Sequence, residues 1–424
     1  MSSSRSDAVI DGGSRERLAW AESWKFRAVI FLCAVAIIIS RRPDAVLHAQ
    51  FWAEDGTVLF SDAYAFGIRS LFWPFAKYFI FYLRLVALAA QPFGLGRAPL
   101  ILNLAAIATQ ALPVWLLLSS RLSWAGSVPA RLFLAGLYLA LPNSEEVMAI
   151  FPNSQWFLAL LCFLVIVSFE SGRWMWRCFD LIVAGLCALT GPFVIVLAPI
   201  SAVIWWKRRG RWALVIAIVL CTGGLIQCVA ILWSHFHRTQ VLGASLGLFF
   251  KIVADQIFLG ALLGMNGFFL KSAGGAVAVA AVGLIFVMYS LWRGPLEMKL
   301  LIFFAAVMFA ASLVSPNMGT WSNVPAWQTL VLPRAGMRYW FLPMLSFVAT
   351  LAWALGAKNP QAVRLFAGYC FLLMAFGIVK DWRYPALPDM HFSGYAEQFE
   401  AARPGTEIVI PINPPGWSMK LVKR

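Results

Sequence analysis

The sequence predicts an all-α protein that crosses a membrane about eleven times. Of its 424 residues, 61% are hydrophobic and only 12% are charged, and the mean hydropathy is +0.77. A soluble domain of this length could not shield so much apolar surface from water, so a bilayer is the expected solvent. The basic residues behind the net charge of +15 stand in short segments between apolar runs, as in cytoplasmic loops. No nucleic-acid partner is expected.

The N-terminal part sets the predicted orientation. Residues 1–25 form a polar, basic tail that is expected in the cytoplasm, so the first apolar helix, residues 26–40, runs outward. This helix lacks a small-residue cleavage site and is expected to be retained. The seven cysteines lie outside polar loops and form no CxxC pair, which predicts neither a disulfide framework nor a zinc site.

The first outer loop, about residues 41–97, contains the sequence QFWAEDGTVL. Its adjacent carboxylates, Glu54 and Asp55, follow Trp52 in a protein that otherwise uses few acidic residues. The pair predicts a general base with a second carboxylate that assists it. The alternative is that outer loops are simply where solvated acids belong.

Later in the same loop, residues 72–92 are apolar but contain Lys77 and Arg84. A charge at the centre of a spanning helix costs roughly 2.5–3.5 kcal/mol. We therefore expect a helix at the membrane interface, with the charges toward headgroups or the active cavity. A true span here is the alternative, and it would invert the loops downstream.

The interfacial interpretation gives a regular topology. Residues 178–206 are too long for one span, and we expect two short helices that turn at Thr190, Gly191 and Pro192. Residues 245–265, with Lys251 and Asp255, are expected to be interfacial or re-entrant. Further spans are expected near residues 98–118, 130–142, 155–169, 212–234, 273–292, 299–315, 338–356 and 362–379. The basic residues then assigned to the cytoplasm are Arg121, Arg131, Arg173, Arg177 and those of 207–211.

The second outer loop, about residues 143–154, holds the other adjacent acidic pair, Glu145 and Glu146, with Asn153 and Gln155 close by. Two acidic loops on one face could surround one cavity with a base and an orienting or metal-binding carboxylate. Asp55 and Glu146 are the candidate ligands. Paired carboxylates suit Mg²⁺ or Mn²⁺, although the sequence does not require a metal.

Cationic partners for an anionic substrate stand in the sequence PRAGMRY. Arg334 and Arg338 are four residues apart, so they share a face if the segment is helical, and Tyr339 follows them. Arginines on the outer side run against the usual charge bias, which favours phosphate binding as much as headgroup anchoring. Lys77 and Arg84 are candidates for the same role.

The last segment, residues 380–424, is predicted to be an extracytoplasmic tail. It is polar and rich in proline, with a strand-like run at residues 407–412. It is too small for a separate catalytic domain. We expect it to cover the outer cavity.

This layout resembles the GT-C superfamily of polytopic glycosyltransferases. The resemblance rests on FWAEDG in the first loop, on Glu145 and Glu146 in the second, and on the run CALTGPFVIVLAP at residues 187–199. That run is similar to the threonine–glycine turn of lipid-phosphate sugar transferases but lacks the lysine often found between the two residues. The motifs NSQWFLAL, RYWFLP and IPINPPGWSM also resemble uncharacterised bacterial glycosyltransferase-like membrane proteins.

The resemblance implies an enzyme of the bacterial inner membrane. It would transfer a sugar from a polyprenyl-phosphate donor to a glycan or lipid acceptor on the outer face, with inversion at the anomeric carbon. Asp55, assisted by Glu54, would be catalytic. The expected substrate-binding residues are Arg334, Arg338, Tyr339, Glu145, Glu146, Asn153, Gln155, Trp52, Lys77 and Arg84. The alternatives are a transporter or flippase for a lipid-linked or anionic precursor, and a non-catalytic envelope subunit.

Overall fold

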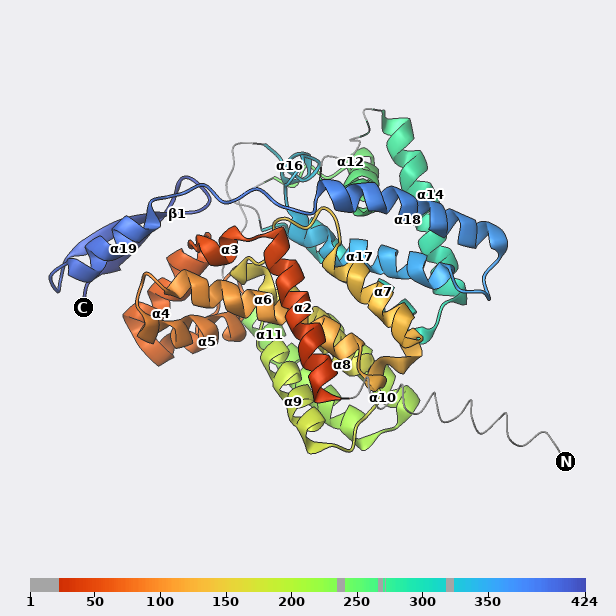
Figure 1. Ribbon diagram of the computed structural model, residues 1–424, viewed down its shortest axis with the longest axis horizontal. Helices are drawn as coiled ribbons and strands as arrows, with labels where there is room; N and C mark the ends of the chain where they lie inside the picture. Colours follow the sequence, from red (N-terminus) through yellow and green to blue (C-terminus); the bar gives the residue numbers. More distant parts are fainter. Residues whose placement is uncertain (1–22, 235–240, 266–269, 271, 318–323) are drawn as a thin grey trace.

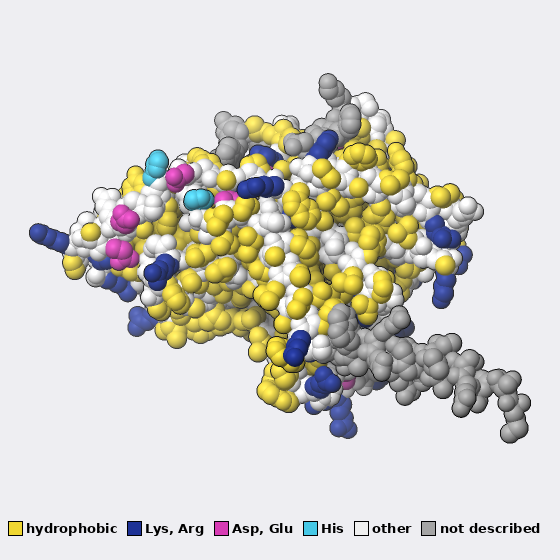
Figure 2. Space-filling model, in the orientation of Figure 1, with side chains coloured by type: hydrophobic (Ala, Val, Ile, Leu, Met, Phe, Trp, Pro, Cys, Tyr) yellow, Lys and Arg dark blue, Asp and Glu magenta, His cyan; other side chains and the backbone are white. Residues whose placement is uncertain are grey.

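Helices make up 71% of the computed structural model, which describes residues 23–234, 241–265, 270, 272–317 and 324–424. The predicted N-terminal tail lies outside these residues except for its last three. Several apolar helices indicate a membrane-embedded protein, as predicted. Hydrophobic side chains cover much of the face in Figure 2, and charged ones gather toward its margins.

Six helices in the described part of the chain are long and apolar enough to cross a membrane. Five match predicted spans, whereas the sixth, Leu246–Leu263, is the segment that we expected to be interfacial or re-entrant. The total of eleven spans therefore stays a prediction. The six are α6 (Ala98–Leu117), α11 (Arg211–Trp233), Leu246–Leu263, α14 (Ala273–Arg293), α15 (Leu296–Val314) and α18 (Gln361–Lys380). Leu246–Leu263 combines α12 (Leu246–Lys251), the π-helix η6 (Ile252–Leu259) and α13 (Gly260–Leu263).

The remaining helices complete the bundle or lie in its loops (Figure 1). The longer ones are α2 (Trp24–Arg41), α7 (Val128–Leu139), α8 (Ser154–Val167), α9 (Trp174–Ala188), α10 (Phe193–Arg208) and α17 (Met337–Ala354). The shorter ones are α3 (Asp44–Leu47), η1 (Asp55–Phe60), α4 (Ser61–Phe66), η2 (Gly67–Phe72), α5 (Phe81–Ala90), η3 (Gln91–Phe93), η4 (Ser120–Ala125), η5 (Phe151–Asn153), α16 (Ala326–Leu330) and α19 (Phe392–Ala401).

Residues 72–92 form no continuous helix. Their helical part, α5, has ten residues and a length of about 15 Å, half of what a hydrocarbon core of about 30 Å requires. Arg84 is buried: its Nη1 lies 2.9 Å from Asp62 Oδ2, and its Nε donates to the Trp73 carbonyl oxygen at 2.9 Å. This geometry agrees with the interfacial interpretation and gives Arg84 a structural partner.

The predicted pair of short helices is present. α9 ends at Ala188 and α10 begins at Phe193, with the turn between them at Thr190, Gly191 and Pro192. Gly191 has a φ of +74°, and a Cβ there would lie 2.7 Å from Gln155 Oε1. Both its backbone conformation and its close packing therefore require glycine.

Opposite ends of α2 contact different kinds of residue. Near its start, the Arg27 guanidinium lies 5.2 Å from the Trp176 ring, and Arg121 lies 4.7 Å from the same ring. At its end, Arg41 donates to the carbonyl oxygens of Leu139 and Leu141, next to the second acidic loop. The acidic loops and the basic loops near Arg121 thus occupy opposite ends of the bundle.

The C-terminal tail contains a β-hairpin. The predicted strand is β1 (Glu407–Ile412), and it pairs antiparallel with β2 (Trp417–Val422), which sequence analysis did not identify. The hairpin packs on η1: a Cβ at Gly56 would lie 3.0 Å from Ile412 Cδ1 and 3.1 Å from Met419 Sδ. The tail therefore lies directly against the first acidic loop, on the left of Figure 1.

Candidate functional site

The second acidic loop is bound to the start of α17 by two ion pairs. The Glu146 carboxylate pairs with the Arg338 guanidinium, and its Oε2 also accepts a hydrogen bond from the Arg338 backbone N–H at 3.0 Å. Glu145 Oε2 lies 3.2 Å from Arg334 Nε. Burial raises the pKa of Glu145, while the nearby Arg334 opposes that shift. Two adjacent glutamates of the second acidic loop thus form ion pairs with two arginines that lie four residues apart near the start of α17.

The first acidic loop reaches the same place through Glu54. This side chain is half-buried, and its negative charge acts on both Arg338 and Tyr78. Residues from three distant parts of the sequence therefore lie within electrostatic range of one another. Such convergence is typical of a binding or catalytic site.

Asp55 has a different environment. Its side chain is 1% exposed, and its Oδ1 accepts a hydrogen bond from the Trp52 backbone N–H at 2.5 Å. Burial raises the pKa of Asp55 well above its usual range, and the charge of Glu54 adds to the effect. The expectation that Asp55 contacts the substrate directly does not suit this geometry, because the carboxyl is closed off from solvent. Glu54 is the accessible member of the pair.

Arg338 is held by several groups at once. Besides Glu146, its guanidinium donates to the Asn317 carbonyl oxygen and lies 3.2 Å from the Tyr339 hydroxyl. Tyr339 donates in turn to the Asn317 carbonyl oxygen at 2.8 Å, and the Trp156 ring lies 6.3 Å from the Tyr339 ring. The arginine is therefore fixed in position before any ligand arrives.

Other predicted site residues support the loops. Asn153 donates to the Glu146 carbonyl oxygen at 2.7 Å, and Gln155 donates to the Pro152 carbonyl oxygen at 3.1 Å. Trp52 is half-buried, and its backbone forms a bridge to Asn413 of the tail. These residues shape the site. Arg84 lies apart from it, in the ion pair with Asp62 described above.

Strained backbone is concentrated in these loops. Eight non-glycine residues in the described part of the chain have a positive φ, and six of them lie in the two acidic loops, in the turn before Tyr78 or beside Arg338. The six are Ala53, Ala76, Lys77, Asn143, Ala149 and Arg334. Such conformations persist only where the surroundings impose them, and they cluster at functional sites.

Sequence analysis missed Tyr78 and Tyr384. Tyr384, in the tail, accepts a hydrogen bond from Arg41 at 2.6 Å and lies 2.9 Å from Ser144 Oγ, so it ties α2 to the second acidic loop. Neither tyrosine belongs to a recognisable motif. The sequence feature that could have indicated Tyr78 is its position next to Lys77, a candidate substrate-binding residue.

The two residues proposed as metal ligands, Asp55 and Glu146, have other partners in the structure. Asp55 is buried and bound to the Trp52 N–H, whereas Glu146 is bound to Arg338. Among the residues that the structure describes, no group of three or more His, Cys, Asp or Glu side chains could hold a metal ion. We therefore derive no step through Mg²⁺ or Mn²⁺.

The two comparisons with known proteins give no further assignment. No protein-family model matches the sequence, and no curated protein matches it significantly. The function is therefore inferred from the site itself.

Proposed function

We propose that the protein is a membrane glycosyltransferase. It transfers a sugar from a polyprenyl-phosphate donor to a glycan or lipid acceptor on the outer face of the bacterial inner membrane. The observation that carries this proposal is the convergence of an accessible carboxylate, Glu54, with a firmly held arginine, Arg338, at one end of a membrane-type helical bundle. A base beside a phosphate-binding cation is what such a transfer needs.

In the proposed reaction Glu54 takes the proton from the acceptor hydroxyl. The acceptor oxygen bonds to the anomeric carbon of the sugar while the bond between that carbon and the phosphate oxygen breaks. Polyprenyl phosphate leaves, and Glu54 keeps the proton until solvent removes it. Asp55 serves as a positioning residue, because its bond to the Trp52 N–H fixes the turn that carries Glu54.

Arg338 and Arg334 neutralise the phosphate. A guanidinium presents paired donors that match phosphate oxygens. Arg338 is oriented by Glu146, whereas Arg334 is about half exposed and free to move toward a ligand despite its contact with Glu145. The same cations stabilise the charge that develops on the leaving phosphate.

An apolar groove beside the site supports a lipid-linked donor. It lies between the segment that carries Tyr78 and the outer end of α11. Its lining is almost entirely hydrophobic and includes Pro74, Phe79, Leu225, Ile226, Val229 and Trp233. A polyprenyl chain could lie in this groove while its phosphate reaches Arg338.

The test is turnover by the purified protein in proteoliposomes. A panel of polyprenyl-phosphate monosaccharides is supplied with acceptor lipids, and release of polyprenyl phosphate is measured. We expect the wild type to turn over at least one donor and Glu54→Gln to lose about 100-fold or more of the rate, because general base catalysis is removed. Glu397→Gln, at an exposed carboxylate in α19, is the matched control. No turnover of any donor, or equal rates for Glu54→Gln and the wild type, would contradict the proposal.

A further inference from the structure

Tyr78 stands at the end of a tight turn with an unusual composition. The backbone groups of Phe75 and Tyr78 are paired in both directions, at 2.8 and 3.1 Å, and enclose only Ala76 and Lys77. Both enclosed residues have a positive φ, of 48° and 88°. Two-residue turns of this kind favour Asn–Gly because other residues adopt the conformation at a cost. The position of Tyr78 therefore depends on a strained backbone at Ala76 and Lys77.

The segment after the turn is braced from two sides. The Gln227 side chain, within α11, accepts from the Phe79 N–H at 2.9 Å and donates to the Phe79 carbonyl oxygen at 3.1 Å. The Gly191 N–H donates to the same carbonyl oxygen at 2.8 Å. Burying a polar side chain in an apolar helix costs free energy unless the side chain is hydrogen-bonded. Both hydrogen bonds of the Gln227 side chain go to Phe79, the residue next to Tyr78.

The hydroxyl of Tyr78 differs from those of the well-buried tyrosines. In the described part of the chain no group hydrogen-bonds to it, and its oxygen is not fully buried. In contrast, hydroxyl hydrogen bonds are made by Tyr82, Tyr138, Tyr339 and Tyr384. Arg338, Tyr339 and Glu54 are the groups that act electrostatically on Tyr78. An unpaired donor therefore stands beside the proposed phosphate-binding arginine.

We propose that the Tyr78 hydroxyl donates a hydrogen bond to a phosphate oxygen of the donor while Arg338 neutralises that phosphate. This inference rests on the proposed function and adds a substrate-contacting residue to it. Burial, assisted by Tyr339, raises the pKa of Tyr78 to about 12. The hydroxyl consequently keeps its proton, and remains a donor, at every pH at which the enzyme would work.

The test is the binding of a fluorescent polyprenyl phosphate, and of the matching polyprenol without phosphate, to the full chain in nanodiscs. Tyr78→Phe keeps the ring and breaks no bond within the described protein, so the fold should survive. We expect the Kd for polyprenyl phosphate to rise about 10–100-fold, the loss typical of a hydrogen bond to a charged group. Binding of the polyprenol should not change. Tyr369→Phe, at an exposed tyrosine of α18, is the control and should bind both as the wild type does.

Failures of the two proposals are distinguishable. Equal affinity of Tyr78→Phe and the wild type for polyprenyl phosphate, with weaker binding by Arg338→Gln, would overturn the role of Tyr78 and leave the site intact. An equal loss for polyprenyl phosphate and polyprenol would also overturn it, because the effect would then come from packing. A wild type that binds both lipids equally would overturn the proposed function itself.

Discussion

Glu54 and Asp55 are adjacent in sequence but occupy different environments. A peptide bond separates them, yet Glu54 is half-buried beside Arg338 whereas Asp55 is 1% exposed and bound to the Trp52 N–H. The sequence could predict that this pair matters, because acidic residues are scarce in the chain. It could not predict which carboxylate is accessible and which is buried, because that depends on η1 and on the hairpin packed against it.

The environment of Asp55 leads to a prediction about stability and pH. Asp55→Asn keeps the oxygen that accepts the Trp52 N–H and removes the ionisable group. Because burial raises the pKa of Asp55, the folded protein holds a proton that the unfolded chain releases. The free energy of unfolding therefore falls as pH rises from the ordinary aspartate pKa toward the raised one, by up to about 1.4 kcal/mol per pH unit.

We expect this fall to be absent in Asp55→Asn, so the variant should gain stability relative to the wild type as pH increases above about 4. Thermal unfolding midpoints of both proteins in detergent, from pH 4 to pH 9, measure the difference. A difference between the two proteins that stays constant with pH would show that Asp55 is not held in its protonated form.

Elements whose signal is local were predictable. The helix break at residues 189–192 follows from Gly191 and Pro192, and β1 follows from the run of β-branched residues within 407–412. The strand β2 was missed although its sequence, WSMKLV, alternates apolar and polar side chains over its first five residues. The ion pairs of Glu145 and Glu146 with Arg334 and Arg338 could not be predicted from the sequence, because they join segments about 190 residues apart.

The hydrogen bonds between Gln227 of α11 and the Phe79 backbone, which we call the brace, can be tested by mutation. Gln227→Leu fills a similar volume but leaves the Phe79 N–H without its partner. An unpaired buried donor costs about 1–3 kcal/mol, and we expect both a lower unfolding midpoint and slower turnover, because the turn loses its support. Ile218→Ala, at an exposed position of the same helix, should change turnover little. Unchanged stability and turnover in Gln227→Leu would show that the brace is dispensable.

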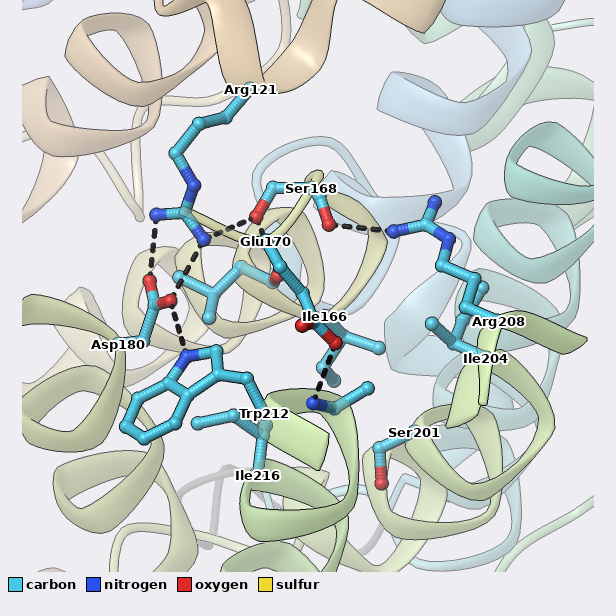
Figure 3. Close-up of a pocket in the computed structure, with 12 residues that line it drawn as sticks. Arg121, Ile166, Ser168, Glu170, Asp180, Ser201, Ile204, Arg208, Trp212 and Ile216 are labelled. Atoms are coloured by element: carbon cyan, nitrogen blue, oxygen red, sulfur yellow. Dashed lines mark hydrogen bonds and ion pairs between the residues drawn. The ribbon is translucent and has the colours of Figure 1, made fainter. Parts of the chain in front are cut away.

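At the scale of the whole molecule, the distribution of charge supports the proposed enzyme over the alternative, a transporter. A transporter is expected to carry polar residues along a central pathway and often shows internal repeats. Here the sequence shows no repeat, and the interacting carboxylates and arginines of the site gather at one end of the bundle. At the other end of the bundle, Arg121 binds Asp180 at 2.8 Å and Trp212 donates to the same carboxylate at 3.0 Å (Figure 3). The polar side chains of this network therefore hydrogen-bond to one another.

The second network has a structural role in this account. Arg208 donates to the Ser168 carbonyl oxygen at 2.6 Å and pairs with Glu297 at 3.2 Å, while Glu170 accepts from the Ala213 N–H at the start of α11. These contacts bind α8, α10, α11 and α15 together on the side that charge bias assigns to the cytoplasm. Arginines with several partners of this kind fix helix ends.

The central claim is that both acidic loops form one site on the outer face, and thiol labelling tests it most directly. Single cysteines replace Glu54, Glu146 and Arg209 in a cysteine-free background, and intact cells are treated with a membrane-impermeant maleimide. We predict labelling of Glu54→Cys and Glu146→Cys in intact cells, and of Arg209→Cys only after permeabilisation. If Glu54→Cys and Glu146→Cys react only after permeabilisation, or if the two differ in sidedness, the claim of a shared outer-face site is wrong.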